Sequence, residues 1–202
     1  MLLARLLAGA SLFALLACSE PPRLPALDEG AVILAFGDSL TRGTGAGAGE
    51  DYPAVLSSLS GRRVINAGVP GEISRDGLRR LPGLLDRHEP ALLILCHGGN
   101  DLLQRRDRKE TAANLERMVR MATERGIAVV LLGVPEPGLL LSDADYYAEV
   151  ASATGAVYVK GVIAKVLGDA SLKSDPVHPN GDGYRRMAEA VYAALREAGA
   201  LR

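Results

Sequence analysis

The sequence is poor in aromatic residues, cysteine and histidine, and each shortage argues against a class of function. Tryptophan is absent and aromatic residues make up 4% of the 202 residues, so a stacking platform for sugars has little material. The three histidines form no His-x-x-x-His pair and no cluster with the two cysteines. We therefore expect no metal site, because zinc and similar ions need three or four such ligands close together.

Charge of one sign is also lacking. The formal net charge is −1, from 23 Lys and Arg residues against 24 Asp and Glu residues, without a long run of either sign. This balance argues against nucleic acid or a strongly acidic partner. The short basic cluster over residues 105–109 is interrupted by Asp107, and we interpret it as an ordinary solvated helix start. The length is that of one domain.

An apolar run long enough to span a bilayer is missing at the N-terminus. The run from Leu6 to Leu16 is shorter than the about 20 residues that a membrane-spanning helix needs. With Arg5 before it, the run predicts a signal peptide over residues 1–17. Leu15-Leu16-Ala17-Cys18 resembles a bacterial lipobox, which implies lipidation of Cys18. A plain secretory signal with an incidental cysteine is the alternative.

The lipobox interpretation also predicts a location in the cell. Serine rather than aspartate follows Cys18, so by resemblance we expect a lipid-anchored protein of the bacterial cell envelope, in the outer membrane. Residues 18–30 are rich in proline and predict a tether. The tether would hold a single folded domain, residues 31–202, off the membrane surface.

Short apolar runs alternate with helical patterns along the rest of the chain. We predict strands over residues 31–36, 63–66, 91–96, 127–133 and 156–159. The predicted helices cover residues 52–59, 74–88, 111–125, 142–153, 162–167 and about 180–198, with Pro82 expected to kink or break the second. This alternation indicates an α/β fold with a parallel sheet covered by helices on both faces.

Polar residues follow the first three predicted strands. Ser39 lies in Gly37-Asp38-Ser39-Leu40, Gly68 ends Asn66-Ala67-Gly68, and Asn100 lies in Gly98-Gly99-Asn100-Asp101. The carboxyl ends of parallel strands meet at one edge of a sheet, where ligands bind. We therefore expect Ser39, Gly68 and Asn100 to lie close together. By itself, Gly-Asp-Ser predicts only a strand, a turn and a capped helix.

A carboxylate and a histidine near the C-terminus complete a catalytic pattern. Asp175 precedes His178 by three residues, in a turn that contains two prolines. A serine hydroxyl is a poor nucleophile until a base takes its proton, and a carboxylate orients that base. We predict Ser39 as nucleophile, His178 as base and Asp175 as its orienting acid. His97 is the rival base, but Asp101 is its only carboxylate nearby in sequence, so a structural or pocket-edge role is favoured.

Four blocks in this order resemble the SGNH hydrolases, also called the GDSL esterase/lipase family. Ser39, Gly68, Asn100 and His178 match the four namesake positions, and Asp175 matches the acid. A narrower likeness to bacterial arylesterases, thioesterases and lysophospholipases is found in residues 66–72, 81–85 and 175–180. The resemblance implies a flavodoxin-like three-layer α/β/α sandwich with five parallel strands. It also implies that Asp101 bonds backbone in its loop.

The family resemblance implies a serine esterase that needs no cofactor. The Ser39 and Gly68 backbone N–H groups and the Asn100 amide would form its oxyanion hole, for which such donors are suited. The expected substrate is a small acyl ester, a thioester or a lysolipid, hydrolysed by a monomer. Two alternatives stay open: an O-acetylesterase acting on cell-wall or other polysaccharide, and a non-catalytic surface lipoprotein.

Three further segments have predicted roles. The glycine-rich residues 43–49 indicate a flexible loop beside the active site rather than a dinucleotide site, because the accompanying acidic residue is missing. The apolar residues 134–141 predict either a rim that contacts an acyl group or a loop that packs on itself. Cys96 ends an apolar run and is expected to be a buried thiol.

Overall fold

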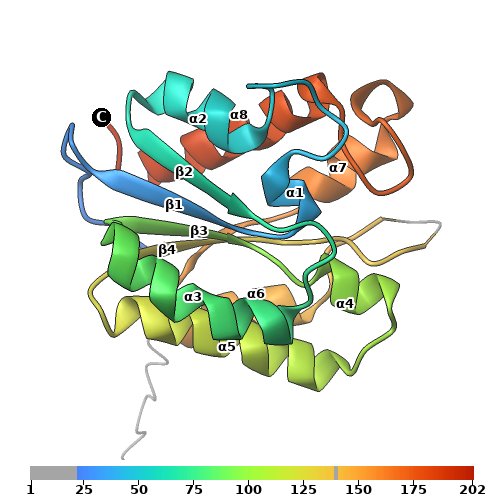
Figure 1. Cartoon of the computed structure of the whole chain (residues 1–202), viewed down its shortest axis with the longest axis horizontal. Coiled ribbons are helices and arrows are strands. Elements are labelled where there is room, and N and C mark those ends of the chain that lie inside the picture. Colours follow the sequence, from blue (N-terminus) through green and yellow to red (C-terminus); the bar gives the residue numbers. More distant parts are fainter. Residues whose placement is uncertain (1–21, 139–140) are drawn as a thin grey trace, which may run out of the picture.

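The computed structural model describes residues 22–138 and 141–202. Five parallel strands form one sheet in the order β2-β1-β3-β4-β5. Their bounds are β1 Val32–Gly37, β2 Arg63–Gly68, β3 Leu92–Cys96, β4 Ala128–Leu132 and β5 Val157–Val159. The apolar runs form the central strands because both faces of a parallel sheet are covered (Figure 1). The predicted α/β sandwich is confirmed.

Helices cover the sheet in two layers (Figure 1). One layer contains α1 (Ser39–Arg42), α2 (Tyr52–Ser60), α7 (Val162–Gly168) and α8 (Gly181–Glu197). The other contains α3 (Ser74–His88), α4 (Gly99–Leu103), α5 (Arg108–Thr123) and α6 (Tyr146–Thr154). A short 3₁₀ turn, Ala170–Leu172, follows α7. The side chains of Met187, Val191 and Leu195 on α8 are fully buried against the sheet layer.

Two helix predictions differ from the structure. α3 runs through Pro82 without a break, one of the two outcomes expected there. α6 begins at Tyr146 rather than Ser142, because Ser142 and Ala144 bond the backbone of Glu136 and Val134 in a short antiparallel bridge. A helix cannot form where the backbone is already paired in this way. The basic cluster does reach into a helix start, since Asp107 caps α5 by accepting from Lys109 N at 2.7 Å.

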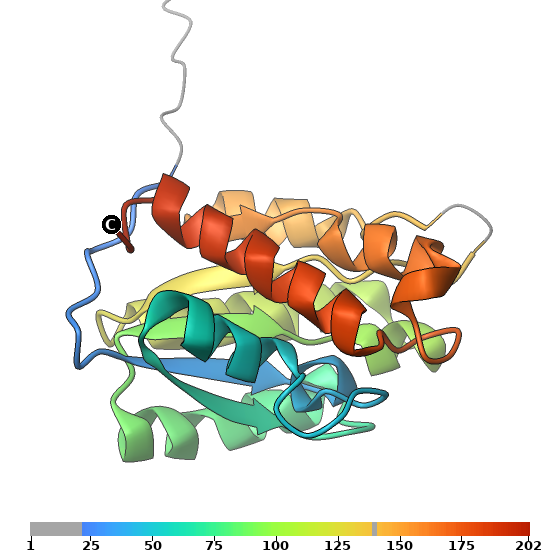
Figure 2. The same ribbon diagram turned by 90° about the horizontal axis from the view of Figure 1, so that it is seen from above.

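Residues 24–27 pack on the domain, which corrects part of the tether prediction for residues 18–30. Leu24 N donates to Ala198 O and Leu27 N donates to Ala200 O, both at 2.9 Å, and Leu27 is buried. Figures 1 and 2 show this segment beside the C-terminus, at the end of the molecule away from the carboxyl ends of the strands. Residues 1–17 and Cys18 lie outside the described residues. Among the described helices, none is long and apolar enough to cross a bilayer.

Candidate active site

Ser39 is placed by the turn between β1 and α1. Asp38 is buried and caps α1, its Oδ1 accepting from Leu40 N at 3.0 Å. Ser39 is therefore the first residue of a helix that begins at the carboxyl end of a central strand. Its backbone N–H donates no hydrogen bond to any other described residue. That N–H and the hydroxyl are both available to a bound molecule.

Asp175 and His178 form a preassembled turn against Ser39. Asp175 Oδ1 accepts from the backbone N–H groups of Val177 and His178, both at 2.8 Å. Asp175 Oδ2 lies 2.7 Å from His178 Nδ1, and His178 Nε2 lies 3.0 Å from Ser39 Oγ. With the Nδ1 proton donated to Asp175, Nε2 is left as the acceptor for the serine hydroxyl. Residues 139 positions apart thus form one hydrogen-bonded series.

The Asp175 carboxyl is held in its ionised form. Its small degree of burial raises the pKa, but hydrogen bonds from the His178 ring and the Val177 and His178 backbone outweigh that effect and lower the pKa below its ordinary value. An ionised carboxylate beside Nδ1 fixes the ring tautomer and stabilises an imidazolium. The turn is therefore suited to taking a proton from Ser39.

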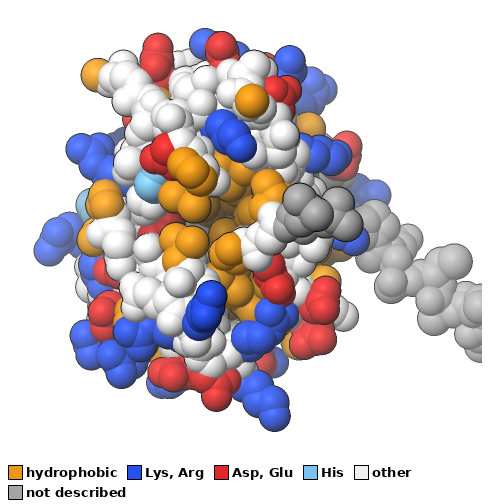
Figure 3. Space-filling view, turned by 90° about the vertical axis from the view of Figure 1, so that its right-hand side faces the viewer, with side chains coloured by type: hydrophobic (Ala, Val, Ile, Leu, Met, Phe, Trp, Pro, Cys, Tyr) orange, Lys and Arg blue, Asp and Glu red, His pale blue; other side chains and the backbone are white. Residues whose placement is uncertain are grey.

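A cavity of about 810 Å³ opens beside Ser39 and His178. Figure 3 shows it as a hollow with hydrophobic side chains on its walls, at the edge where the strands end. The apolar side chains that line it include Leu103, Val134, Pro137, Leu141, Leu167 and Val177. The predicted rim, residues 134–141, thus contributes to the wall, whereas Thr44 is the one residue of the loop 43–49 in the described lining.

Gly68 is not part of this site, contrary to the prediction. Its N–H donates to Asn66 Oδ1 at 3.0 Å, and its Cα packs so closely on the Arg42 backbone that a Cβ would overlap it. Gly71, three residues later, lines the cavity instead. Its N–H donates no hydrogen bond among the described residues.

The Pro70-Gly71 pair explains why the chain brings Gly71 rather than Gly68 to the cavity. Glu72 N bonds Val69 O at 3.2 Å and Gly71 has a φ of 78°. Proline followed by a glycine at positive φ is typical of a type II turn. The pair was a signal for this turn in the sequence. Asn100, at the start of α4, lines the cavity as predicted, and its Nδ2 donates to Glu72 O at 3.0 Å.

His97 is not the base, because both of its ring nitrogens are engaged elsewhere. Gly98 N donates to Nδ1 at 2.9 Å, so Nε2 carries the proton and donates to Glu72 Oε2 at 3.1 Å. The favoured structural role of this buried residue is confirmed. Its carboxylate partner is Glu72, which sequence proximity could not reveal. Asp101 instead accepts from Ser74 N at 2.8 Å and Ser74 Oγ at 2.7 Å. Its backbone partner therefore lies at the start of α3 and not in its own loop, as had been expected.

Two other features bear on the chemistry of the chain. Cys96 is fully buried, and burial raises the pKa of its thiol well above the ordinary value, which disfavours the reactive thiolate. In residues 22–138 and 141–202, no three His, Cys, Asp or Glu side chains are grouped to hold a metal ion.

Comparison with known proteins identifies the family. The sequence model of the GDSL-like Lipase/Acylhydrolase family matches residues 35–186. Esterase TesA of Pseudomonas aeruginosa is 29% identical over 175 residues, covering 81% of this chain and 87% of the relative. Thioesterase 1/protease 1/lysophospholipase L1 of Escherichia coli K12 is 28% identical over 173 residues, covering 78% and 79%.

Solved structures agree with this assignment. The crystal structure of TesA is 28% identical with a TM-score of 0.74, covering 83% of this chain and 99% of that one. AlinE4, an SGNH-hydrolase family esterase, is 33% identical with a TM-score of 0.67, covering 86% and 99%. The chain therefore belongs to the GDSL-like Lipase/Acylhydrolase family and is a carboxylic ester hydrolase.

Proposed function

We propose that this esterase cleaves aryl or short acyl esters, thioesters or lysophospholipids through an acyl-enzyme on Ser39. The observation that carries the proposal is the hydrogen-bonded series from Ser39 Oγ to His178 and on to Asp175, at 3.0 and 2.7 Å. A protein that kept the fold but lost catalysis would not need Ser39, His178 and Asp175 to stay within hydrogen-bond distance of one another.

The reaction begins with proton transfer from Ser39 Oγ to His178 Nε2 as the oxygen attacks the ester carbonyl. Asp175 stabilises the imidazolium that forms, and His178 then gives the proton to the leaving alcohol or thiol. A water molecule, activated by the same histidine, attacks the acyl-enzyme and releases the acid. Each step needs only groups that the structure brings within hydrogen-bond distance.

The negative carbonyl oxygen needs donors that are already oriented. We assign this role to the N–H groups of Ser39 and Gly71 and to the free Nδ2 proton of Asn100, with Gly71 replacing the predicted Gly68. All three residues line the cavity. One such donor contributes about 2.7–4 kcal/mol to transition-state binding.

The walls of the cavity favour an acyl chain over an acetylated sugar. Leu103, Val134 and Leu141 offer apolar surface beside the triad, and burial of each CH₂ group against such surface contributes about 0.8 kcal/mol. An acetylesterase would gain nothing from these side chains. The polysaccharide O-acetylesterase is therefore the less favoured alternative.

Hydrolysis of p-nitrophenyl esters from acetyl to palmitoyl tests the proposal. The full chain, Ser39→Ala and the exposed control Ser58→Ala would be assayed together. We expect turnover in the parent and the control, loss in Ser39→Ala, and a preference for chains longer than acetyl. Equal rates in parent and Ser39→Ala would refute the serine mechanism, and strict acetyl preference would refute the acyl-chain assignment.

We also propose that Cys18 is lipidated and anchors the protein in the outer membrane. The lipobox supports this, and the packing of Leu24 and Leu27 beside the C-terminus bears on orientation. That end lies away from the cavity (Figures 1 and 2), so the anchored enzyme would present its cavity away from its own membrane. Palmitate labelling of the parent, Cys18→Ala and the control Cys96→Ala tests the anchor; label retained in Cys18→Ala would refute it.

A further inference from the structure

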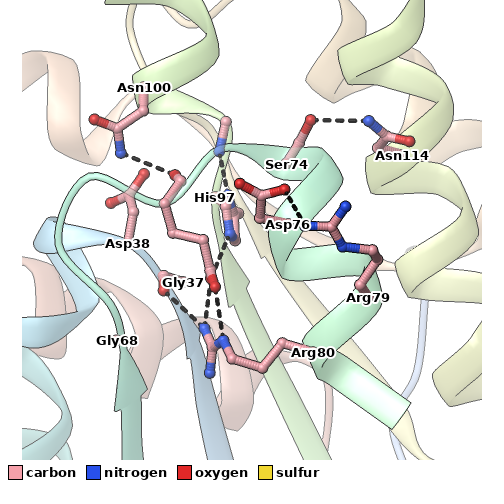
Figure 4. Close-up of polar contacts among 12 residues, drawn as sticks. Gly37, Asp38, Gly68, Ser74, Asp76, Arg79, Arg80, His97, Asn100 and Asn114 are labelled. Atoms are coloured by element: carbon pink, nitrogen blue, oxygen red, sulfur yellow. Dashed lines mark hydrogen bonds and ion pairs between the residues drawn. The ribbon is translucent and has the colours of Figure 1, made fainter.

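A partly buried ionic cluster lies beneath the turns of the active site. Glu72, Arg80 and His97 form it, with side chains that are 9%, 26% and 0% exposed. Arg80 bonds both Glu72 carboxylate oxygens, at 2.8 and 2.6 Å, and His97 Nε2 donates to Oε2 at 3.1 Å. Figure 4 shows Arg80, His97 and Asn100 grouped around this point. The proposed reaction does not use any of the three cluster side chains directly.

The cluster contacts each of the three turns that supply oxyanion donors. Arg80 Nη2 donates to Gly37 O at 3.4 Å, two residues before Ser39. Glu72 directly follows Gly71 and closes its turn through the bond from Glu72 N to Val69 O. Glu72 O accepts from Asn100 Nδ2 at 3.0 Å, which leaves the second Nδ2 proton free for the cavity. Three segments far apart in sequence thus meet at one cluster, the Ser39 turn through Arg80 and the other two through Glu72.

The cluster is rigid because its charges are fully paired. Burial raises the pKa of Glu72, but the hydrogen bonds from His97 and Arg80 outweigh it and hold that pKa at about 2. The Arg80 guanidinium also lies 4.3 Å from the centre of the Phe36 ring. A bidentate Arg–carboxylate pair fixes direction as well as distance. The contacts of the Glu72 carboxylate with Arg80 and His97 therefore also fix the position of the Glu72 main chain.

We propose that Glu72, clamped by Arg80 and His97, is the positioning residue of the oxyanion hole. It sets the Gly71 N–H through the main chain and the Asn100 amide through its carbonyl oxygen, and Arg80 connects both to the Ser39 turn. This inference rests on the proposed roles of Ser39, Gly71 and Asn100. Glu72 does not touch the reacting atoms, and it acts only through the donors.

Weakening the contacts of the Glu72, Arg80 and His97 cluster should slow the chemical step more than it weakens substrate binding. A displacement of about 1 Å at a reacting centre costs on the order of 100-fold in rate. The oxyanion donors act mainly on the transition state, so kcat falls while KM changes little. A general loss of folding would instead lower the active fraction without altering the affinity of the molecules that remain active.

The test compares Glu72→Gln and Arg80→Lys with a matched control, Arg79→Lys. Glu72→Gln replaces one carboxylate oxygen, which accepts hydrogen bonds from Arg80 or His97, by an NH₂ group that can only donate. Arg80→Lys removes the forked pair of guanidinium donors but keeps the positive charge. Arg79 is the adjacent residue on α3, with a side chain that is 72% exposed and paired with Asp76. Full-length parent, Ser39→Ala and the three variants would be measured for kcat, KM, melting temperature and inhibition by an alkyl boronic acid, which forms a tetrahedral adduct on serine.

We expect kcat to fall about 10- to 100-fold in Glu72→Gln and Arg80→Lys, with KM within about threefold and boronate affinity reduced in proportion to kcat/KM. Arg79→Lys should match the parent. The inference is overturned if both clamp variants keep kcat within threefold, or if they lose activity while active molecules bind boronate as the parent does. If Glu72→Gln does not fold, Arg80→Lys decides alone. A parent no faster than Ser39→Ala would instead refute the proposed function.

Discussion

Replacing Gly77 with alanine should destabilise the protein, although alanine is the better helix former. Gly77 lies inside α3, and a Cβ added there would overlap the His97 imidazole at Nε2. In an exposed helix interior, the same change stabilises by about 1 kcal/mol. Here the added methyl group must displace the ring that donates to Glu72. The sign of the effect is therefore set by tertiary packing.

The expected change in the free energy of unfolding combines two destabilising contributions and one stabilising contribution. Overpacking a well-filled interior costs about 1–3 kcal/mol, and loss of the hydrogen bond to the charged Glu72 costs about 1.5–3 kcal/mol. Set against the gain in helix propensity, the free energy of unfolding falls by about 2–5 kcal/mol. For a chain of this size each kcal/mol lowers the melting temperature by about 2–4 °C.

Gly83→Ala is the matched control on the same helix. Gly83 is exposed and a Cβ there meets nothing within 4 Å, so the substitution should raise stability by up to about 1 kcal/mol. Urea unfolding of parent, Gly77→Ala and Gly83→Ala measures both effects, with the m-value checking that the transition is comparable. A Gly77→Ala protein as stable as Gly83→Ala would refute the tight packing of His97 on α3.

Three further outcomes are expected. Asn100→Ala should lower kcat about 100- to 1,000-fold through loss of one oxyanion donor, measured by steady-state kinetics; a change under threefold contradicts the assignment. Because the folded pKa of Glu72, about 2, lies below its ordinary 4.5, its ionised form stabilises the protein above pH 4.5 and this contribution is lost as pH falls towards 2. The difference in urea midpoint between the parent and Glu72→Gln should decrease as the pH falls from 4.5 towards 2. A difference that stays constant would show that ionisation of Glu72 does not stabilise the protein. In Cys18→Ser, Cys96 should resist a thiol reagent until the protein unfolds; fast labelling of the native protein would contradict its burial.

The fold and the triad were predictable because their signals are local. Each buried strand is a short apolar run, and the residues that follow a parallel strand must lie at the same edge of the sheet. The Asp175–His178 pair is held by hydrogen bonds within four residues. Once both residues were placed at this edge of the sheet, their proximity could be expected, and the structure brings Ser39 and His178 together.

Two predictions failed, the oxyanion glycine and the start of α6, because neighbouring residues have similar sequence patterns but different tertiary contacts. Gly68 is the last residue of β2 and Gly71 follows it three positions later, and the sequence pattern alone did not decide between them. The structure favours Gly71 because Gly68 packs on the Arg42 backbone while the Val69–Glu72 turn extends to the cavity. Likewise, residues 142–144 have a helical pattern but pair with residues 134–136.

The α/β class, the five strands and the Ser39, Asp175 and His178 set could be predicted from the sequence, because short-range pattern and turn chemistry indicate all of these. The folded domain was needed to show that Glu72 is the partner of His97, 25 residues away, and that Arg80 joins them. A buried charge must find partners wherever the packing of α3 on the sheet provides them. That choice depends on contacts across the whole domain, which no local pattern encodes.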